Sequence, residues 1–295
     1  MRILIVSDTA THPTNAGNSK LILEYCNLFN RWGHGVHIVY IPSHGFTQKG
    51  QNAGSVEREA MKTYWGNRYH EYKRSFWENI KNNYHFKYRK VFSNGYCKCD
   101  DVYPNGLTSY VNSLNEKYHF DACIVNYIRM SKALEGINIP RKALFTHDYY
   151  TYKNLLVGEM VDYACKPNEE AKALQRAPYI FAMQDIEAAF FHCLSPNSKI
   201  LINYANYTYH EQAYAGNHNL MFLSGNNQFN IKGIKWFIAD ILPLIYRSYP
   251  DTKLIIGGKI CSCLNEYKDD SHIDLQGLID DANAFFLQGD VAINP

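Results

Sequence analysis

The chain has 295 residues, 46% of them hydrophobic, and a formal net charge of +2, which is typical of a globular protein with about two domains. This composition excludes a disordered tail, a repeat array and a strongly basic nucleic-acid-binding domain. The opening MRILIVSDTA reaches an aspartate after a few apolar residues, and no later window has the roughly 18 consecutive apolar residues of a membrane span. We therefore expect a cytoplasmic protein with reduced cysteines.

The first forty residues predict a β-α-β unit. Residues 2–7 form a short apolar run with β-branched side chains, which favours a buried parallel strand. A helix is expected to begin near Ser19, a good N-cap residue, and to end at Gly33 and Gly35. A second strand follows over residues 36–41. Such a unit is expected to be right-handed, with parallel strands.

The segment over residues 57–90 combines basic and aromatic side chains. It holds nine Lys or Arg residues against four Glu, together with nine aromatic residues. This mixture suits the headgroup level of an anionic membrane, and it equally suits stacking on sugar rings. A helical subdomain with solvated basic faces is the third interpretation, and the sequence leaves the three open.

The rest of the chain continues the α/β pattern. Strands are expected over residues 121–127, 143–148, 179–183 and 199–202, with helices over 168–177 and 185–194. Several of these strands end in polar residues, and ligands of open α/β sheets bind at the carboxyl ends of the strands. Residues 203–217 lose hydrophobic periodicity and are interpreted as a linker.

A second α/β domain is expected after the linker, with strands over residues 220–224, 253–256, 273–275 and 291–293 and helices over 231–247 and 281–287. The sequence thus predicts two Rossmann-like domains, residues 1–205 and 206–295, the first with a basic and aromatic insertion over about 50–115. The second region has 90 residues, fewer than the roughly 150 of a full Rossmann-like domain. We expect it to be incomplete.

Four segments carry a family resemblance. They are MRILIVSD with HPTNAGNSK and RWGHGVHIVYI, then LFTHD, then EEAKALQRAPYIFAMQDIEAAFF, and last LMFLSGNNQFNIKGIKWFIADILPLIYRSYPDTKLIIGGK. In this order they resemble the large retaining glycosyltransferase family with the GT-B fold, often called family 4. The resemblance implies a nucleotide-sugar donor whose diphosphate is bound by backbone amides and basic side chains without a metal.

The resemblance places the donor near five residues. Gly17 and Asn18 match a glycine loop beside the donor phosphates and the reacting sugar; the alternative is a turn glycine that needs a positive φ. Gly225, Lys232 and Lys259 match the diphosphate site, with solvated surface lysines as the alternative. Many relatives carry an arginine where this chain has Asn226.

His147 and Asp148 are the catalytic candidates. They follow a predicted strand and match positions near the acceptor or the transferred sugar, where a histidine could bind a sugar hydroxyl. The alternative is a structural histidine followed by a helix-capping aspartate. The family's acidic pair would lie beyond Pro295, so we expect little or no transfer by this chain alone.

The expected function is transfer of a sugar with retention to a saccharide or lipid-linked acceptor, in polysaccharide or glycoconjugate synthesis. The alternatives are a GT-B-fold nucleotide-sugar epimerase and a non-catalytic nucleotide-sugar-binding module. We expect no cofactor, no metal and no nucleic-acid partner, and a peripheral location at the inner membrane face. The Cys97/Cys99 and Cys261/Cys263 pairs lack the usual zinc spacing. The first strand is not followed by the GxGxxG of a dehydrogenase.

Overall fold

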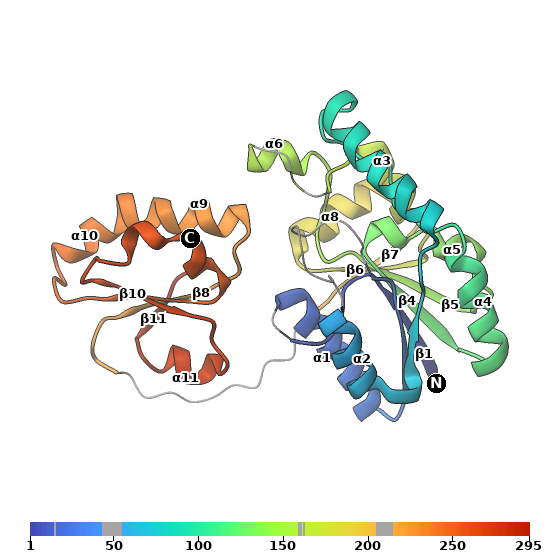
Figure 1. The fold of residues 1–295 in the computed structure, drawn as a ribbon, viewed down its shortest axis with the longest axis horizontal. Coiled ribbons are helices and arrows are strands. Elements are labelled where there is room, and N and C mark those ends of the chain that lie inside the picture. The colour runs from blue at the N-terminus through green and yellow to red at the C-terminus, as the bar shows by residue number, and fades with distance from the viewer. Residues whose placement is uncertain (15, 43–54, 159–160, 162, 205–214) are drawn as a thin grey trace. The chain divides into compact units, whose positions relative to one another are not determined.

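A computed structural model describes residues 1–295 except 15, 43–54, 159–160, 162 and 205–214. The chain divides into two compact units, Met1–Asn206 and Tyr207–Pro295. Most of the predicted linker and the start of the predicted insertion lie outside the described residues. Both units have the expected α/β architecture, and Figure 1 shows the elements of each.

The described part of unit one is built on a seven-stranded sheet in the order β3-β2-β1-β4-β5-β6-β7. All neighbouring strands are parallel, and Ile5 of β1 lies opposite both Ile38 of β2 and Ile124 of β4. The strands are β1 (Arg2–Ser7), β2 (Gly35–Tyr40), β3 (Tyr69–Glu71), β4 (Ala122–Asn126), β5 (Arg141–Phe145), β6 (Tyr179–Ala182) and β7 (Lys199–Ile202). The six strands predicted for this region are therefore confirmed to within a few residues.

Helices cover both faces of this sheet. Their bounds are α1 (Gly17–Arg31), α2 (Ser55–Trp65), α3 (Phe76–Phe92), α4 (Leu107–Tyr118), α5 (Ala133–Gly136), α6 (Lys153–Val157), α7 (Pro167–Leu174) and α8 (Asp185–Leu194), with 3₁₀ turns η1 (Gly66–Arg68) and η2 (Ile128–Met130). Helix α1 begins at Gly17, close to the predicted start near Ser19, but the predicted N-cap is wrong: Ala16 is the N-cap, and Ser19 is buried inside the first turn.

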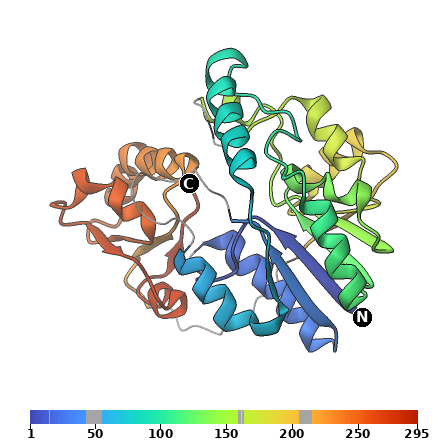
Figure 2. The same ribbon diagram turned by 45° about the vertical axis from the view of Figure 1, so that its right-hand side comes forward.

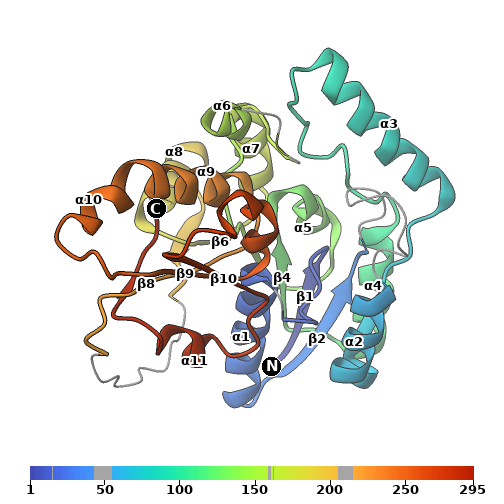
Figure 3. The ribbon, with the colours of Figure 1, turned by 60° about the vertical axis from the view of Figure 1, so that its left-hand side comes forward.

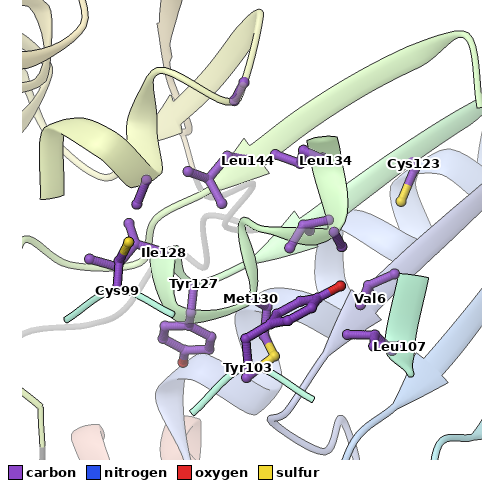
Figure 4. Packing of buried hydrophobic residues seen from close by; sticks show 14 of the residues in the cluster. Val6, Cys99, Tyr103, Leu107, Cys123, Tyr127, Ile128, Met130, Leu134 and Leu144 are labelled. Atoms are coloured by element: carbon purple, nitrogen blue, oxygen red, sulfur yellow. The ribbon is translucent and has the colours of Figure 1, made fainter. Parts of the chain in front are cut away.

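Alternation along the strands creates two cores. In β1, Leu4 and Val6 belong to one hydrophobic cluster, while Ile3 and Ile5 belong to another on the opposite face, as the period of two in a strand requires. Residues of α4, α5, α7 and α8 pack in the first cluster, and residues of α1 and α2 pack in the second. Figure 3 shows these helices around the sheet, and Figure 4 shows side chains of the first cluster.

The segment predicted as an insertion contributes to the fold of unit one. Strand β3 pairs with β2 at the edge of the sheet, and α4 is the helix that precedes β4. Both were missed from sequence. Strand β3 has only three residues, too few to show a period, and α4 lies within the segment that was interpreted as an insertion. None of the described helices has the length and apolar character needed to cross a bilayer.

Unit two has a second parallel sheet in the order β10-β9-β8-β11. Its elements are β8 (Leu220–Leu223), α9 (Gln228–Trp236), the π-helical turn η3 (Phe237–Ile241), α10 (Leu242–Tyr246), β9 (Leu254–Gly257), the 3₁₀ turns η4 (Lys259–Cys263) and η5 (Asn265–Tyr267), β10 (Ile273–Gly277), α11 (Ala282–Phe286) and β11 (Val291–Ala292). The helix predicted over 231–247 is divided into α9, η3 and α10. Pro243 in the first turn of α10 lacks the N–H that a continuous helix would use.

Candidate functional site

Polar residues gather at the carboxyl ends of three strands of unit one. Asp8 follows β1, Asn126 ends β4, and His147 lies two residues beyond β5. Strand β1 has β2 on one side and β4 on the other. The order in which successive strands are added to the sheet therefore reverses at this point. Open α/β sheets bind their ligands at such a switch point.

Asn126 determines the hydrogen bonding of His147. The Asn126 side chain donates from Nδ2 to the backbone oxygen of Val6 at 3.3 Å, and its Oδ1 lies 2.6 Å from His147 Nε2. Tyr25 donates its hydroxyl to the same Oδ1 at 2.9 Å. Since the amide nitrogen is used at the backbone carbonyl, the oxygen faces the imidazole, and His147 must donate from Nε2. This leaves the His147 Nδ1 lone pair as an acceptor.

His147 is held as a neutral imidazole. Its ring stacks on Phe145 with 4.2 Å between centroids and on Tyr127 with 4.5 Å. Burial, followed by the nearby charge of Arg129, lowers the pKa of His147 to about 3. The residue also has a positive φ of 62°, a costly conformation that is often found at functional sites. At pH 7 the imidazole is therefore a hydrogen-bonding group and not a proton donor in its charged form.

Arg129 forms a fixed positive charge beside this histidine. Its Nη2 donates to Asp8 Oδ1 at 2.8 Å, and its Nε donates to Asp8 Oδ2. The guanidinium lies 4.1 Å from the centre of the Tyr127 ring. Burial by itself would lower the Arg129 pKa, but the charge of Asp8 outweighs it and the pKa is raised. The two-bond pairing with a carboxylate gives the guanidinium one defined orientation.

The start of α1 joins the same cluster. Asn18 donates from Nδ2 to the Tyr127 hydroxyl at 2.8 Å and accepts from the backbone N–H of Ser19. Gly17, the first residue of α1, is exposed, and a Cβ added to it would meet no atom within 4 Å. Its φ is not positive, so the interpretation as a strained turn glycine is wrong. The structure brings Asn18 and His147 to one ring, that of Tyr127.

Asp148 forms an ion pair with a lysine of α6. Its carboxylate accepts from Lys153 Nζ in α6, and its side chain is about one-third exposed. The alternative interpretation, in which Asp148 caps a helix, is wrong: Tyr152 is the N-cap of α6, and no side chain bonds that cap. A carboxylate paired with a lysine can still accept a further hydrogen bond.

Gly225 and Lys259 of unit two lie after neighbouring parallel strands, β8 and β9. Gly258 makes the close approach of these two segments possible. Its φ is +99°, and a Cβ there would lie 2.2 Å from the backbone oxygen of Ser224, so only glycine fits. Both Gly225 and Lys259 are exposed.

Lys232 lies farther along the helix than the sequence suggested. Helix α9 begins at Gln228, and Asn227 caps it by accepting from the Asn230 N–H at 2.9 Å. Lys232 is thus in the second turn of α9, exposed to solvent. It is not at the helix start, where unpaired N–H groups bind phosphates.

Sequence reasoning missed the residues that organise the polar cluster around His147: Asp8, Asn126, Tyr127 and Arg129. Their position directly after strands was a usable signal, because polar residues at strand ends often face ligands. The pairing of Asp8 with Arg129 joins positions 121 residues apart and has no local signature. In the described part of the chain, no group of three or more His, Cys, Asp or Glu side chains is arranged to hold a metal ion.

Comparison with known proteins gives structural but no sequence matches. No family model and no curated protein matches the sequence. The pneumococcal O-GlcNAc transferase GtfA, solved with UDP and GlcNAc, has a TM-score of 0.60 at 9% identity over 99% of this chain and 78% of its own.

Two further solved structures show the same likeness. Staphylococcus aureus TarM, in a complex containing UDP and α-GlcNAc-glycerol, has a TM-score of 0.54 at 10% identity, over 94% of this chain and 77% of TarM. Sucrose-phosphate synthase from Thermosynechococcus elongatus has a TM-score of 0.55 at 11% identity, over 99% of this chain and 74% of that enzyme. Because these matches span the elements of both parallel α/β units, the chain has the GT-B fold of these glycosyltransferases.

Proposed function

We propose that this protein transfers a sugar from a nucleotide-sugar donor to a saccharide or lipid-linked acceptor, with retention of the anomeric configuration. One observation carries the proposal: a neutral His147, fixed by Asn126 as the Nε2–H form, lies at the switch point of a GT-B sheet. The structural neighbours GtfA and TarM were solved with UDP and a GlcNAc-containing ligand, which supports a donor of this class.

The neutral imidazole suits sugar recognition. With Nε2 donating to Asn126, the Nδ1 lone pair of His147 can accept from a sugar hydroxyl. A charged imidazolium would instead repel the positive charge that develops on the sugar ring during transfer. Arg129, fixed by Asp8, contributes a positive charge that opposes protonation of His147. We assign Asp148 to a second hydroxyl contact, oriented by Lys153.

The transfer step requires no reagent other than the donor and the acceptor. The acceptor hydroxyl oxygen bonds to the anomeric carbon while the bond from that carbon to the diphosphate oxygen breaks. The diphosphate takes the electron pair of the broken bond and the proton of the acceptor hydroxyl. Retention requires the acceptor to approach the face that the diphosphate leaves.

We propose that the donor phosphates bind near Gly225 and Lys259 in unit two. Lys259 is an exposed cation that follows Gly257, the last residue of β9, and Gly258. Lys232 is exposed in the second turn of α9. Gly225, with open space at the Cβ position, allows close approach of a phosphate to the backbone.

The first test is calorimetric titration of the whole chain with UDP, GDP and ADP. We expect binding of one of these nucleotides and a loss of about tenfold in affinity for Lys259→Ala, the effect of one charge-assisted contact. Lys268→Ala, which removes another exposed lysine of unit two, is the matched control and should bind as the unchanged protein does. No binding of any of the three would overturn the proposal.

The second test separates transfer from its alternatives. The chain is incubated with the sugar form of the nucleotide that binds, with and without saccharide acceptors, and the products are separated by mass and by sugar epimer. Since we expect little or no transfer by residues 1–295 alone, the same incubation is made with a version extended past Pro295. Its transfer should depend on the acceptor and should fall in His147→Ala with nucleotide affinity unchanged. An epimerised sugar without acceptor would indicate an epimerase, and binding without any product would indicate a binding module.

A further inference from the structure

Helix α3 has its polar and apolar sides reversed with respect to an ordinary surface helix. Six large residues lie on its outer side: Phe76, Trp77, Ile80, Tyr84, Tyr88 and Phe92, here called the α3 apolar face. All are exposed, Trp77 by 75% and Phe92 by 73%. At about 100° per residue they fall within an arc of roughly 160°, so they lie on one side of the helix, together with the exposed Lys81. A surface helix normally turns such a stripe toward the core.

The side of α3 that faces the rest of unit one is polar. The Glu78 carboxylate accepts from the Tyr72 hydroxyl at 3.1 Å and from the Ser75 N–H at 2.8 Å. Asn82 is only 6% exposed, and His85 Nδ1 lies 3.7 Å from the Asp101 carboxylate. The Tyr72–Glu78 hydrogen bond and the His85–Asp101 pair thus hold the polar side of the helix against its neighbours, and the apolar side is left outward. Figure 2 shows α3 projecting from the body of unit one.

The exposed rings contact one another along the helix. The Tyr84 and Tyr88 rings stack with 6.1 Å between centroids, and Tyr88 and Phe92 lie 5.2 Å apart. Phe76 and Trp77 meet edge to face at 5.7 Å. Contiguous apolar patches of this kind are rare on soluble monomers and mark sites of protein or membrane interaction.

The charge of the α3 segment indicates whether a protein or a membrane binds the α3 apolar face. The sequence of α3 contains Lys81, Lys87, Arg89 and Lys90 against one acid, Glu78, and the Glu78 carboxylate is bonded on the inner side. Over residues 57–90 the basic surplus is five, more than the net charge of +2 of the whole chain, so the remainder of the chain is net acidic. The positive charge of the sequence is therefore concentrated in the segment that carries the exposed aromatic residues.

We infer that the α3 apolar face docks on the surface of an anionic lipid bilayer. Trp and Tyr side chains are favoured at the headgroup level, where the ring is in an apolar medium and its polar atom contacts water. The lysines and arginines in the sequence of the same helix are attracted to acidic lipids. Helix α3 lies flat in the interface and does not cross it. This contact is independent of sugar transfer and would remain if the proposed transfer were wrong.

The experiment is flotation of the whole protein with phosphatidylcholine vesicles, prepared with and without phosphatidylglycerol. We expect flotation with the anionic vesicles, reduced at high salt, and little with phosphatidylcholine alone. The double variant Trp77→Ser/Phe92→Ser should lose at least about tenfold in partitioning. Because both side chains are mostly exposed, the variant should keep its circular dichroism spectrum. Trp32→Ser, which removes a tryptophan that is 61% exposed at the end of α1, is the matched control and should float as the unchanged protein does.

Three results would overturn the inference. They are absence of flotation with anionic vesicles, equal flotation by the double variant, and self-association that the double variant abolishes without vesicles. The last result, seen by sedimentation velocity, would assign the face to a second copy of the chain. Nucleotide titration of the double variant keeps the two proposals separate, because membrane docking and donor binding are expected to fail independently.

Discussion

At the scale of single residues, an asparagine sets the chemistry of the candidate catalytic histidine. Asn126 receives hydrogen bonds from His147 and Tyr25 and donates to Val6. Each of these contacts depends on the amide having one orientation, so they support one another. A His147 side chain held in this way accepts through Nδ1. Protonation there would remove that acceptor and add a buried positive charge near Arg129, while the Nε2–H bond to Asn126 would remain.

This arrangement predicts an acid sensitivity. The pKa of His147 is lowered from 6.5 to about 3 in the folded state, so the unfolded chain binds more protons between these values and stability falls as pH falls through this window. Between pH 7 and pH 5 the effect is about 2 kcal/mol. Urea unfolding at both pH values should show that His147→Gln loses less stability than the unchanged protein. His192→Gln, an exposed position on α8, should lose as much as the unchanged protein, and equal losses in all three would contradict the prediction.

At the scale of elements, a buried glutamate connects α7 to the segment after β5. Glu170 is fully buried and accepts from the backbone N–H groups of Tyr150 at 2.9 Å and Thr151 at 2.7 Å, and from the Thr151 hydroxyl. Burial raises the pKa of Glu170, and these hydrogen bonds partly oppose that change. The glutamate thereby fixes the segment that carries His147 and Asp148 on its way to α6.

Glu170→Gln should therefore destabilise unit one. The amide can accept through only one oxygen, and its NH₂ group would face a donor, which leaves a buried polar group unpaired at a cost of about 1–3 kcal/mol. The measurement is the urea midpoint followed by circular dichroism at pH 7. Glu116→Gln on the exposed side of α4 makes the same chemical change in solvent and should shift stability by less than about 0.5 kcal/mol. Similar shifts for both variants would show that Glu170 does not anchor this segment.

At the scale of the whole molecule, each unit buries its own core. The two clusters around the large sheet contain residues of unit one only, and the clusters around Ile256 and Phe285 contain residues of unit two only. A domain with its own core can fold by itself. Both sheets are parallel and covered by helices, which is the usual condition for stability of such sheets.

Unit one should consequently fold as a separate fragment. A chain ending at Asn206 keeps the seven-stranded sheet and the buried Trp65, whose fluorescence reports unfolding. We expect a cooperative transition with the midpoint of one transition of the full chain. A fragment that shows no cooperative transition, under conditions where the full chain does, would mean that unit two contributes to the core of unit one.

The sequence by itself determined the class of fold, most of the strands and the place of His147. Short apolar runs and helical periodicity are local properties, and the polar residue at the end of a strand is visible in the same window. Only the tertiary structure decided what surrounds that histidine. Asn126 and Arg129 acquire their roles from strand order and from Asp8, and contacts over such separations leave no periodic trace.

The same distinction holds for α3 and for the glycines. A helical pattern over residues 76–92 does not reveal which side meets the protein, since that depends on polar partners such as Tyr72 and Asp101. Gly258 cannot be replaced by a larger residue because the backbone of Ser224 lies against it, whereas Gly17 has open space. In the sequence each is simply a glycine, and nothing distinguishes the two requirements. Sequence specifies local conformation through short-range sterics and hydrophobic pattern, while the chemistry of a site depends on which distant groups the closed chain brings together.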